Sequence, residues 1–490
     1  MPSIPTIAQK SPLPPIDSVM LWLALIQGSS ATLSIALYAD LPVPAATLAT
    51  LVSLVWAGMY VVAGVGLFVS FGLNWATWLV RYRLLLVLIV AGALASTAWS
   101  VEPRLTAERG AHLFGTTLVA LYLGFRIPLR TILDTTARAL AILLILSTLA
   151  ALVWPTLGIE DYQGRPVWRG ITASKNTLGF WAAVSILLFT TRLAASRALA
   201  ARFGWLLLLG LAVLCLAQSV SATSVLALLI AIGTMLYLYA ATELRLGLLP
   251  MILLGLLVAA LAGVAFQSID TAELIGRSGD LTGRAQVWKE TSRLIMQRPL
   301  SGFGYGALWF PTSASLWVQQ SLMDFSWIVY HAHNGPLHIA SEVGLPLTVL
   351  TLVFIVQQLV ETVWCQYRQP QHGVLFVLGF SVILLVSNYA EARLLINRDL
   401  FWIFFVTLPI SMVRQVQLVA DGTISAPLLY LGAPFGNARG GPGEHRERLA
   451  RQRALKRRLR VQRDDEPNAM APGKTARQDT PMLPRQNEPQ

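Results

Sequence analysis

Long apolar segments alternate with short polar stretches through the first 415 residues of the chain. Each apolar segment has roughly 20 residues, the length with which an α-helix crosses a bilayer. Ten-residue stretches of alternating apolar and polar positions, the pattern of a membrane β-barrel, are absent from the sequence. Backbone polar groups in lipid must be satisfied within their own segment, so the pattern favours helices. We expect about 12 transmembrane helices, at residues 19–39, 45–71, 84–100, 110–127, 138–157, 176–194, 203–218, 221–241, 246–267, 335–363, 373–390 and 399–415.

The polar stretch at residues 268–334 is too long for a simple connection between two spanning helices. Within it, residues 281–299 follow a 3.6-residue period and predict an amphipathic helix. Arg284 and Trp288 are four residues apart and therefore share one face of that helix. Glycines at 302, 304 and 306 follow the predicted helix and end it. We expect any chemistry that the chain performs to take place in this loop.

These patterns divide the chain into three parts. Residues 1–18 form a short N-terminal segment, and residues 19–415 form a polytopic membrane domain that carries the loop at 268–334. Residues 416–490 become rich in glycine, proline and arginine, a composition typical of disordered segments. The fold class that we predict is an all-α polytopic membrane protein.

Composition supports this class. The 490-residue chain is 55% hydrophobic and 13% charged, whereas a soluble domain has about a quarter charged residues. The two cysteines, Cys215 and Cys365, lie in or beside apolar segments far apart in the sequence. We interpret them as small buried hydrophobic residues, and not as a disulfide or a redox pair.

The formal net charge of +12 is concentrated in the C-terminal tail. In a membrane protein such a basic run marks the cytoplasmic side and interacts with anionic lipid headgroups, so we expect no nucleic-acid partner. Most of the short basic loops fall on the same side as this tail. With an even number of spans, both termini are then expected to be cytoplasmic.

The opposite face also carries cations, against the usual bias. Such cations can extend to headgroups or pair with nearby carboxylates. For Arg169, Arg284 and Arg393 we favour an anionic ligand instead. Arginine presents a fixed fork of donors that matches phosphate oxygens and stays charged at any physiological pH.

Three motifs are expected to meet on that face. They are residues 168–176 before one span, residues 282–284 at the start of the loop helix, and residues 331–335 before another span. Arg169 and Arg284, with a helix N-terminus near Asn176, could bind a diphosphate. His333 could act as a general base near neutral pH. His331, His333 and His338 could alternatively hold zinc, but no carboxylate or thiolate at matching spacing accompanies them.

In these motifs the sequence resembles the O-antigen ligase and polysaccharide polymerase (Wzy-C) superfamily, particularly its ExoQ-type exopolysaccharide proteins. The resemblance covers roughly residues 80–415. It rests on the following elements: Arg169-Gly170 leading to Asn176, Arg284 four residues before Trp288, the Pro-Leu-x-Gly-x-Gly-x-Gly run from Pro299 to Gly306, His333-Asn334 leading to Gly344, and Asn388, Glu391 and residues 399–402 near the end.

The resemblance implies a GT-C-like glycosyltransferase of the bacterial inner membrane with a large periplasmic loop. Its donor would be an oligosaccharide on undecaprenyl diphosphate, and its acceptor a lipid-linked glycan or lipid A-core. By this analogy Arg169 and Arg284 bind the donor diphosphate and His333 activates the acceptor hydroxyl. Lys175, Asn176, Asn334, Glu391 and Arg393 are further expected substrate contacts. No cofactor or metal is implied, and membrane lipids, a chain-length regulator and export proteins are expected partners.

Two alternatives remain open at this stage. The ligase pattern expects Gly, Thr or Tyr three residues after the closing glycine, where this chain has Leu347, and this departure favours a polymerase over a ligase. A transporter or flippase for the same lipid-linked sugars would also have many helices. A transporter of this kind predicts an internal repeat and helices broken near the midplane. We find no convincing repeat, and the polar groups gather on one face.

Overall fold

The structure, a computed structural model, describes residues 13–38, 44–162, 164–244, 284–309, 329–368 and 371–420, together with residues 317 and 320. The chain divides into two compact units, Met1–Pro434 and Phe435–Gln490, and every described residue belongs to the first. The expected span at 246–267 and almost all of the expected disordered tail lie outside the described residues.

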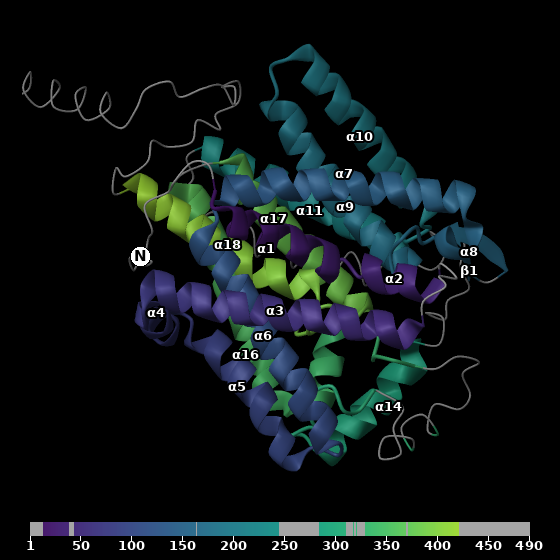
Figure 1. Cartoon of the computed structure of the whole chain (residues 1–490), viewed down its shortest axis with the longest axis vertical. Coiled ribbons are helices and arrows are strands. Elements are labelled where there is room, and N and C mark those ends of the chain that lie inside the picture. Colours follow the sequence, from purple (N-terminus) through teal and green to yellow (C-terminus); the bar gives the residue numbers. More distant parts are fainter. Residues whose placement is uncertain are drawn as a thin grey trace, which may run out of the picture. The chain divides into compact units, whose positions relative to one another are not determined.

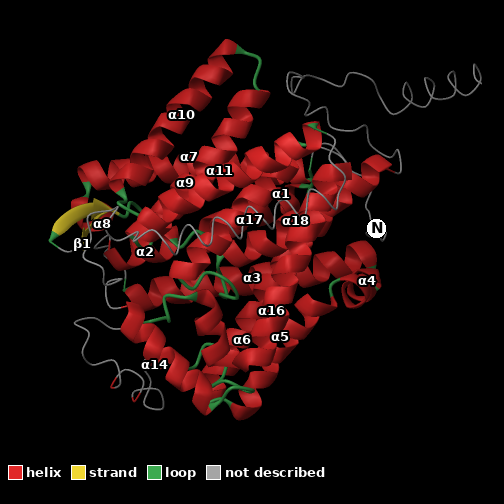
Figure 2. Cartoon of the chain, turned by 180° about the vertical axis from the view of Figure 1, so that it is seen from behind, coloured by secondary structure: helices red, strands yellow, loops and turns green. Residues whose placement is uncertain are grey.

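Helices make up nearly all of the described chain, and its two strands form one small hairpin (Figures 1 and 2). The elements before this hairpin are α1 (Pro15–Gly28), α2 (Ala31–Tyr38), α3 (Ala45–Phe71), α4 (Asn74–Tyr82), α5 (Leu84–Ala95), a 3₁₀ turn (Ser96–Trp99), α6 (Pro103–Arg126), α7 (Leu129–Val153) and α8 (Pro155–Gly158). The hairpin and the elements after it are β1 (Ile159–Tyr162), β2 (Arg165–Trp168), α9 (Lys175–Ala195), α10 (Leu199–Gln218), α11 (Ala222–Glu243), α14 (Arg284–Gln297), α16 (Gly335–Arg368), α17 (His372–Ala390) and α18 (Leu400–Ala420).

Each expected span within the described residues is mainly helical, which confirms the all-α polytopic membrane fold. Eight described helices are long and apolar enough to cross a bilayer, or nine if α4 and the helix after it are one span bent by 97°. The expected number of 12 is therefore not reached in this part of the chain. Helix α6 is not among the eight, and α1 is a shorter apolar helix.

The expected span at 19–39 is divided in two at Ser29 and Ser30. Ser30 has a positive φ of 61°, a conformation that ends α1 before α2 begins. A Cβ on Gly28, the last residue of α1, would lie 3.0 Å from the backbone nitrogen of Leu400. Glycine at this position thus lets α1 end directly against the first residue of α18.

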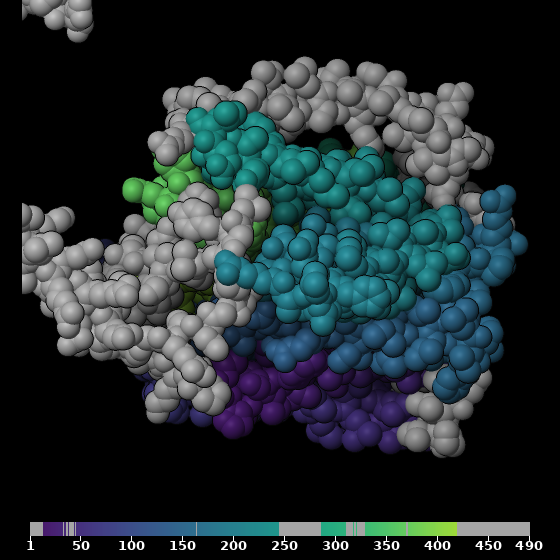
Figure 3. Space-filling view, turned by 90° about the horizontal axis from the view of Figure 1, so that it is seen from above, coloured from purple at the N-terminus to yellow at the C-terminus, as the bar shows by residue number. Residues whose placement is uncertain are grey.

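Helix α18 lies at the centre of the packing, with 94% of its apolar window buried. It contacts α1, α6, α16 and α17. Aromatic rings fill its interface with α9, where Phe401 stacks on Trp181 with centroids 4.9 Å apart and meets Phe180 edge-on at 4.3 Å. In the space-filling view the N-terminal helices, α7 and the α10–α11 pair follow one another across one face (Figure 3), in agreement with contacts of α7 with α1 and α10.

Helix α16 is broken at Gly344, which has a φ of 81° and is followed two residues later by Pro346. The glycine-rich run fits against this break. Backbone N–H groups of Phe303 and Gly304 donate to the carbonyls of Ser341 and Glu342, at 3.1 and 2.8 Å. Leu345 in turn donates to the carbonyl of Pro299 at 2.7 Å. The run from 299 to 306 therefore satisfies the carbonyls that the break would otherwise leave without partners.

The antiparallel hairpin pairs Ile159 with Trp168 and Tyr162 with Arg165. Its turn includes Gly164, whose φ is 74° and whose N–H donates to the Asp161 side chain at 3.0 Å. Beyond the hairpin, Arg169 and Gly170 both donate through their backbone to the carbonyl of Gly158. These contacts fix the chain that leads into α9.

Candidate functional site

Four parts of the chain supply the polar residues of the candidate site. They are the start of α9, helix α14, residues 329–334 before α16, and the connection 391–399 between α17 and α18. Asn176 and Glu391 are 215 positions apart in the sequence, and hydrogen bonds of side chains to side chains and to the backbone bring these parts together.

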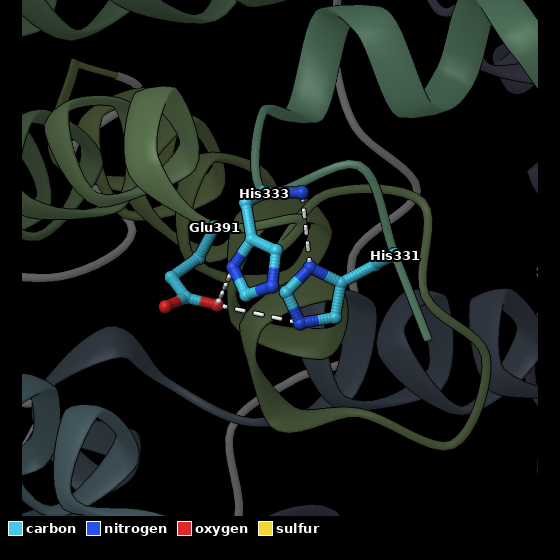
Figure 4. A group of neighbouring side chains, drawn as sticks. All are labelled: His331, His333 and Glu391. Carbon is cyan, nitrogen blue, oxygen red and sulfur yellow. Dashed lines mark hydrogen bonds and ion pairs between the residues drawn. The ribbon is translucent and has the colours of Figure 1, made fainter. Parts of the chain in front are cut away.

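Glu391 is the residue on which these parts converge (Figure 4). Its Oε1 accepts a 2.7 Å hydrogen bond from the side-chain amide of Asn176. Its Oε2 faces two histidines, at 3.5 Å from Nε2 of His331 and 3.8 Å from Nδ1 of His333. One carboxylate thus connects α9 with the segment before α16.

His333 has a strained backbone. Its φ of 50° is rare for a residue with a side chain, and such outliers gather at functional sites. The carbonyl of His333 accepts a 3.3 Å hydrogen bond from Nε1 of Trp288, and the same indole meets the ring of Tyr389 edge-on. Helix α14 therefore rests on the histidine segment through Trp288.

The two histidine rings are close, with centroids 4.0 Å apart. Nδ1 of His331 accepts the backbone N–H of His333 at 3.1 Å. In the neutral ring the proton then lies on Nε2, the nitrogen that faces Glu391. This carboxylate therefore lies within ion-pair distance of one nitrogen of each ring.

Among the described residues, His331, His333 and Glu391 are also the one group with metal-ligand spacing, with ligand atoms within 4.8 Å of one another. The zinc alternative with His338 is wrong, because Nε2 of His338 faces Glu342 at 3.6 Å within α16. A metal on the new trio would need Nε2 of His331 without its proton. The hydrogen bond that Nδ1 accepts opposes that tautomer, so the geometry favours hydrogen bonding over metal binding.

Asn176 and Lys175, both expected substrate contacts, are held by protein groups at the start of α9. Oδ1 of Asn176 accepts from the Ser221 hydroxyl at 3.2 Å. Nζ of Lys175 donates to the carbonyl of Val220 and lies 3.5 Å from the centre of the Tyr162 ring. These contacts tie the start of α9 to the start of α11 and to the hairpin.

The free N–H groups that we expected at the start of α9 are occupied. The Lys175 N–H donates to Glu160 and the Thr177 N–H to the Ser174 hydroxyl. Burial raises the pKa of Glu160, while the Lys175 N–H and the charges of Arg169 and Lys175 lower it. Two N–H groups at this helix terminus thus already have partners within the protein, and the expected diphosphate site there stays a prediction.

Arg169 is buried, and two of its nitrogens have partners. Nε and Nη2 donate to the carbonyls of Leu157 and Thr156, at 2.9 and 2.7 Å, and the guanidinium lies over the ring of Tyr38. A guanidinium has five N–H donors, so these bonds fix its plane and leave Nη1 for a further partner.

Arg393 is also buried, with its guanidinium against the rings of Phe180 and Phe401. Burial lowers its pKa, and the charges of Glu391 and Asp399 raise it. Its Nη1 donates to the Thr177 hydroxyl at 3.4 Å. Arg393 is thus a buried cation that interacts electrostatically with Glu391 and Asp399, and its expected contact with substrate stays a prediction.

Asn334 and Arg284 complete the predicted set. Oδ1 of Asn334 accepts the N–H of Leu337, which caps α16, and its amide donates to the carbonyl of Tyr389 at 3.3 Å. Arg284 is the first residue of α14, one turn before Trp288. Its side chain lies outside what the structure describes.

The sequence interpretation missed a role for Asn388 and underestimated Glu391. Oδ1 of Asn388 accepts the backbone N–H groups of Arg393 and Leu394, at 2.8 and 3.1 Å. A Cβ on Gly335 would collide with the Asn388 amide, so the turn before α16 rests directly on this side chain. The sequence signals were the position of these polar residues at the end of an apolar span and their place in the resemblance to ExoQ-type proteins.

Leu347 proves to be a packing residue. It projects from α16 onto α5, where a Cβ on Gly92 would lie 2.7 Å from Cδ1 of Leu347. The residue that departs from the ligase pattern thus takes part in helix packing, and the preference for a polymerase drawn from it stays a prediction.

Comparison with known proteins agrees with this architecture. Residues 205–352 match the family described as O-antigen ligase. The chain is also 28% identical over 369 residues to the exopolysaccharide production protein ExoQ of Rhizobium meliloti (strain 1021), covering 71% of this chain and 82% of that protein. The resemblance seen in the motifs is thereby confirmed. The chain is a multi-pass membrane protein that is similar to the O-antigen ligase family over these residues and to a protein of exopolysaccharide production over most of its length.

Proposed function

We propose that this protein is a glycosyltransferase that polymerises undecaprenyl-diphosphate-linked oligosaccharide units at the periplasmic face of the bacterial inner membrane. The observation that carries the proposal is the position of Glu391, bonded to Asn176 and facing both His331 and His333. A carboxylate behind a histidine selects the ring tautomer that leaves the far nitrogen able to accept a proton.

In the proposed reaction Nδ1 of His333 carries its hydrogen toward Glu391, and Nε2 takes the proton of an acceptor hydroxyl. The acceptor oxygen forms a bond to the anomeric carbon of the donor sugar. The bond between that carbon and the diphosphate oxygen breaks, and its electron pair remains on undecaprenyl diphosphate. The leaving group is therefore an anion that the protein must stabilise.

Cations at the start of α9 and of α14 supply that stabilisation in this proposal. Arg169 contributes its Nη1 donors from a guanidinium whose plane is fixed by Leu157 and Thr156. Arg284 contributes from the first turn of α14, a helix that Trp288 joins to His333. Fixed donors of this kind lower a barrier because they need no rearrangement as the charge develops.

Two observations favour the polymerase over its rivals. The relative that covers most of the chain is named for exopolysaccharide production. The polar groups of the site gather where α17 meets α18 and where α16 begins, whereas a carrier needs sites that open alternately to both sides. Transfer to lipid A-core, the ligase reaction, is the second candidate because the matched family is described as O-antigen ligase.

The test follows lipid-linked repeat units in membranes that contain wild-type protein, Arg284→Ala or His333→Ala, with chain length resolved on gels. We expect a ladder of polymers from the wild type and accumulation of single units in both variants at equal protein level. Arg293→Ala is the matched control, because Arg293 lies exposed on the same helix and pairs with Glu290. Single units on lipid A-core without a ladder would identify a ligase, and full activity of both variants would reject the site.

A further inference from the structure

A second basic cluster lies at the other end of the 391–399 connection, and the proposed reaction does not use it. Arg398 donates from Nη1 to the Ser53 hydroxyl at 3.2 Å, and its Nη2 lies 2.8 Å from Nε2 of His112. Its backbone N–H donates to the Thr116 hydroxyl at 2.9 Å. The cluster thus joins this connection to α3 and α6.

The cluster lies within the length of these helices and not at their ends. Ser53 is eight residues into α3 and His112 nine residues into α6, or about 12–14 Å from the start of each helix at 1.5 Å per residue. Only 22% of the apolar window of α3 is buried, so this helix faces outward over most of its surface. The apolar run of α6 begins only near residue 110, so on that helix the cluster lies close to one end of the expected span. A cation held among membrane helices often marks a substrate or ion pathway.

The charge of Arg398 has no counter-ion in the described part of the chain, where no carboxylate lies within ion-pair distance of it. Glu108, which lies 3.8 Å from His112, is 65% exposed. Nε of Arg398 is buried and has no hydrogen-bond partner. Its φ of 57° is unusual for a residue with a side chain. A buried donor of this kind calls for an anionic acceptor.

We propose that Arg398, with Ser53 and His112, binds the diphosphate of a second polyprenyl lipid, the one that carries the acceptor glycan. This inference rests on the proposed function, because polymerisation requires two lipid-linked substrates whose diphosphates need separate sites. Arg398 follows Glu391 by seven positions, a path of at most about 25 Å. An acceptor held at Arg398 can therefore reach His333 with its oligosaccharide. A ligase acceptor carries no polyprenyl diphosphate and has no use for this site.

The test counts undecaprenyl diphosphate molecules bound to the full-length protein by native mass spectrometry. We expect two on the wild type, one on Arg398→Gln and one on Arg284→Gln. Arg165→Gln, which removes an exposed cation from β2, is the matched control and should retain two. Ser53→Ala and Arg398→Lys keep the charge, so they test the same site if Arg398→Gln does not fold. Each should weaken the second binding step, Arg398→Lys by roughly tenfold through loss of the fork of donors.

Two results would overturn the proposal. One is retention of both lipids by Arg398→Gln. The other is displacement of the Arg398-dependent lipid by an equal concentration of phosphatidylglycerol, which would make this a general phospholipid site. Because binding is counted without turnover, the result is separate from the polymer ladder. If the protein binds two lipids but forms no ladder, the proposed function is refuted and the second lipid site is supported. If it forms a ladder but binds one lipid, the proposed function is supported and the second lipid site is refuted.

Discussion

The side-chain amide of Asn176 donates a 2.7 Å hydrogen bond to Glu391 across 215 residues of sequence. Asn176 lies in the first turn of α9, and Glu391 follows the last residue of α17. The bond directs Oε2 of Glu391 toward the two histidines, since Oε1 is already occupied. The orientation of His333, the proposed base, thus depends on a contact between two helices that are distant in the sequence.

Glu391→Gln should lower turnover by about 10²–10⁴-fold, because an amide cannot select the productive tautomer of His333 as a carboxylate does. Asn176→Ala should have a smaller effect of the same kind, since it loosens Glu391 without removing it. The measurement is the rate of polymer formation at saturating substrate across pH. Glu290→Gln, which changes a partly buried acid of α14 that pairs with Arg293, is the control. An unchanged pH profile in Glu391→Gln would contradict the assigned role.

Asn388→Ala should destabilise the protein, because it leaves the buried N–H groups of Arg393 and Leu394 without their acceptor. Each buried group that loses its partner costs about 1–3 kcal/mol. Asn388→Asp keeps an acceptor oxygen at the same place and should recover part of the loss. Thermal unfolding in detergent and the rate of polymer formation are the two measurements. Equal behaviour of the alanine and aspartate variants would show that these hydrogen bonds are not the cause.

Gly302→Ala should lower the thermal midpoint. Gly302 has a φ of 63°, and a Cβ there would collide with the backbone of Glu342 at the break in α16. The left-handed conformation alone costs about 1–2 kcal/mol for a residue with a side chain. Gly210→Ala is the matched control, because nothing lies within 4 Å of a Cβ at that position in α10. If both variants melt together, the contact between the glycine run and α16 is not a rigid one.

The pH dependence of stability should include a contribution from Asp399. Burial raises its pKa to about 7, while the Phe401 N–H and the charge of Arg393 lower it. An unfolded aspartate has a pKa of about 4. Between these values the unfolded chain releases the proton and the folded chain retains it, so stability falls as pH rises from about 4 to about 7. Above about pH 7 the ionisation of Asp399 causes no further change in stability.

Asp399→Asn should flatten this decline. Its amide oxygen can still accept the Phe401 N–H that Asp399 accepts at 2.6 Å, so the start of α18 keeps its cap. The measurement is the apparent unfolding midpoint of both proteins between pH 4.5 and 8. A decline of equal slope in the two proteins would assign the effect to other groups.

The sequence determined the membrane domain, the positions of most helices and the end of the domain at which the polar residues gather. These features follow from local hydropathy and from glycine and proline positions, which act on neighbouring residues. Helix α3, for example, begins and ends at the residues that its apolar run predicted. The amphipathic helix α14 was predicted in the same way, within a few residues at each end.

Only the tertiary structure decided which partner each polar side chain takes. His331 and His333 face Glu391 and not His338, the start of α9 is occupied by Glu160, and Leu347 packs on α5. The division of the first apolar run into α1 and α2 likewise depends on the contact of Gly28 with Leu400. Residues that meet in this way are separated by tens to hundreds of positions. Hydropathy and spacing describe only near neighbours, so they contain no information about such pairs.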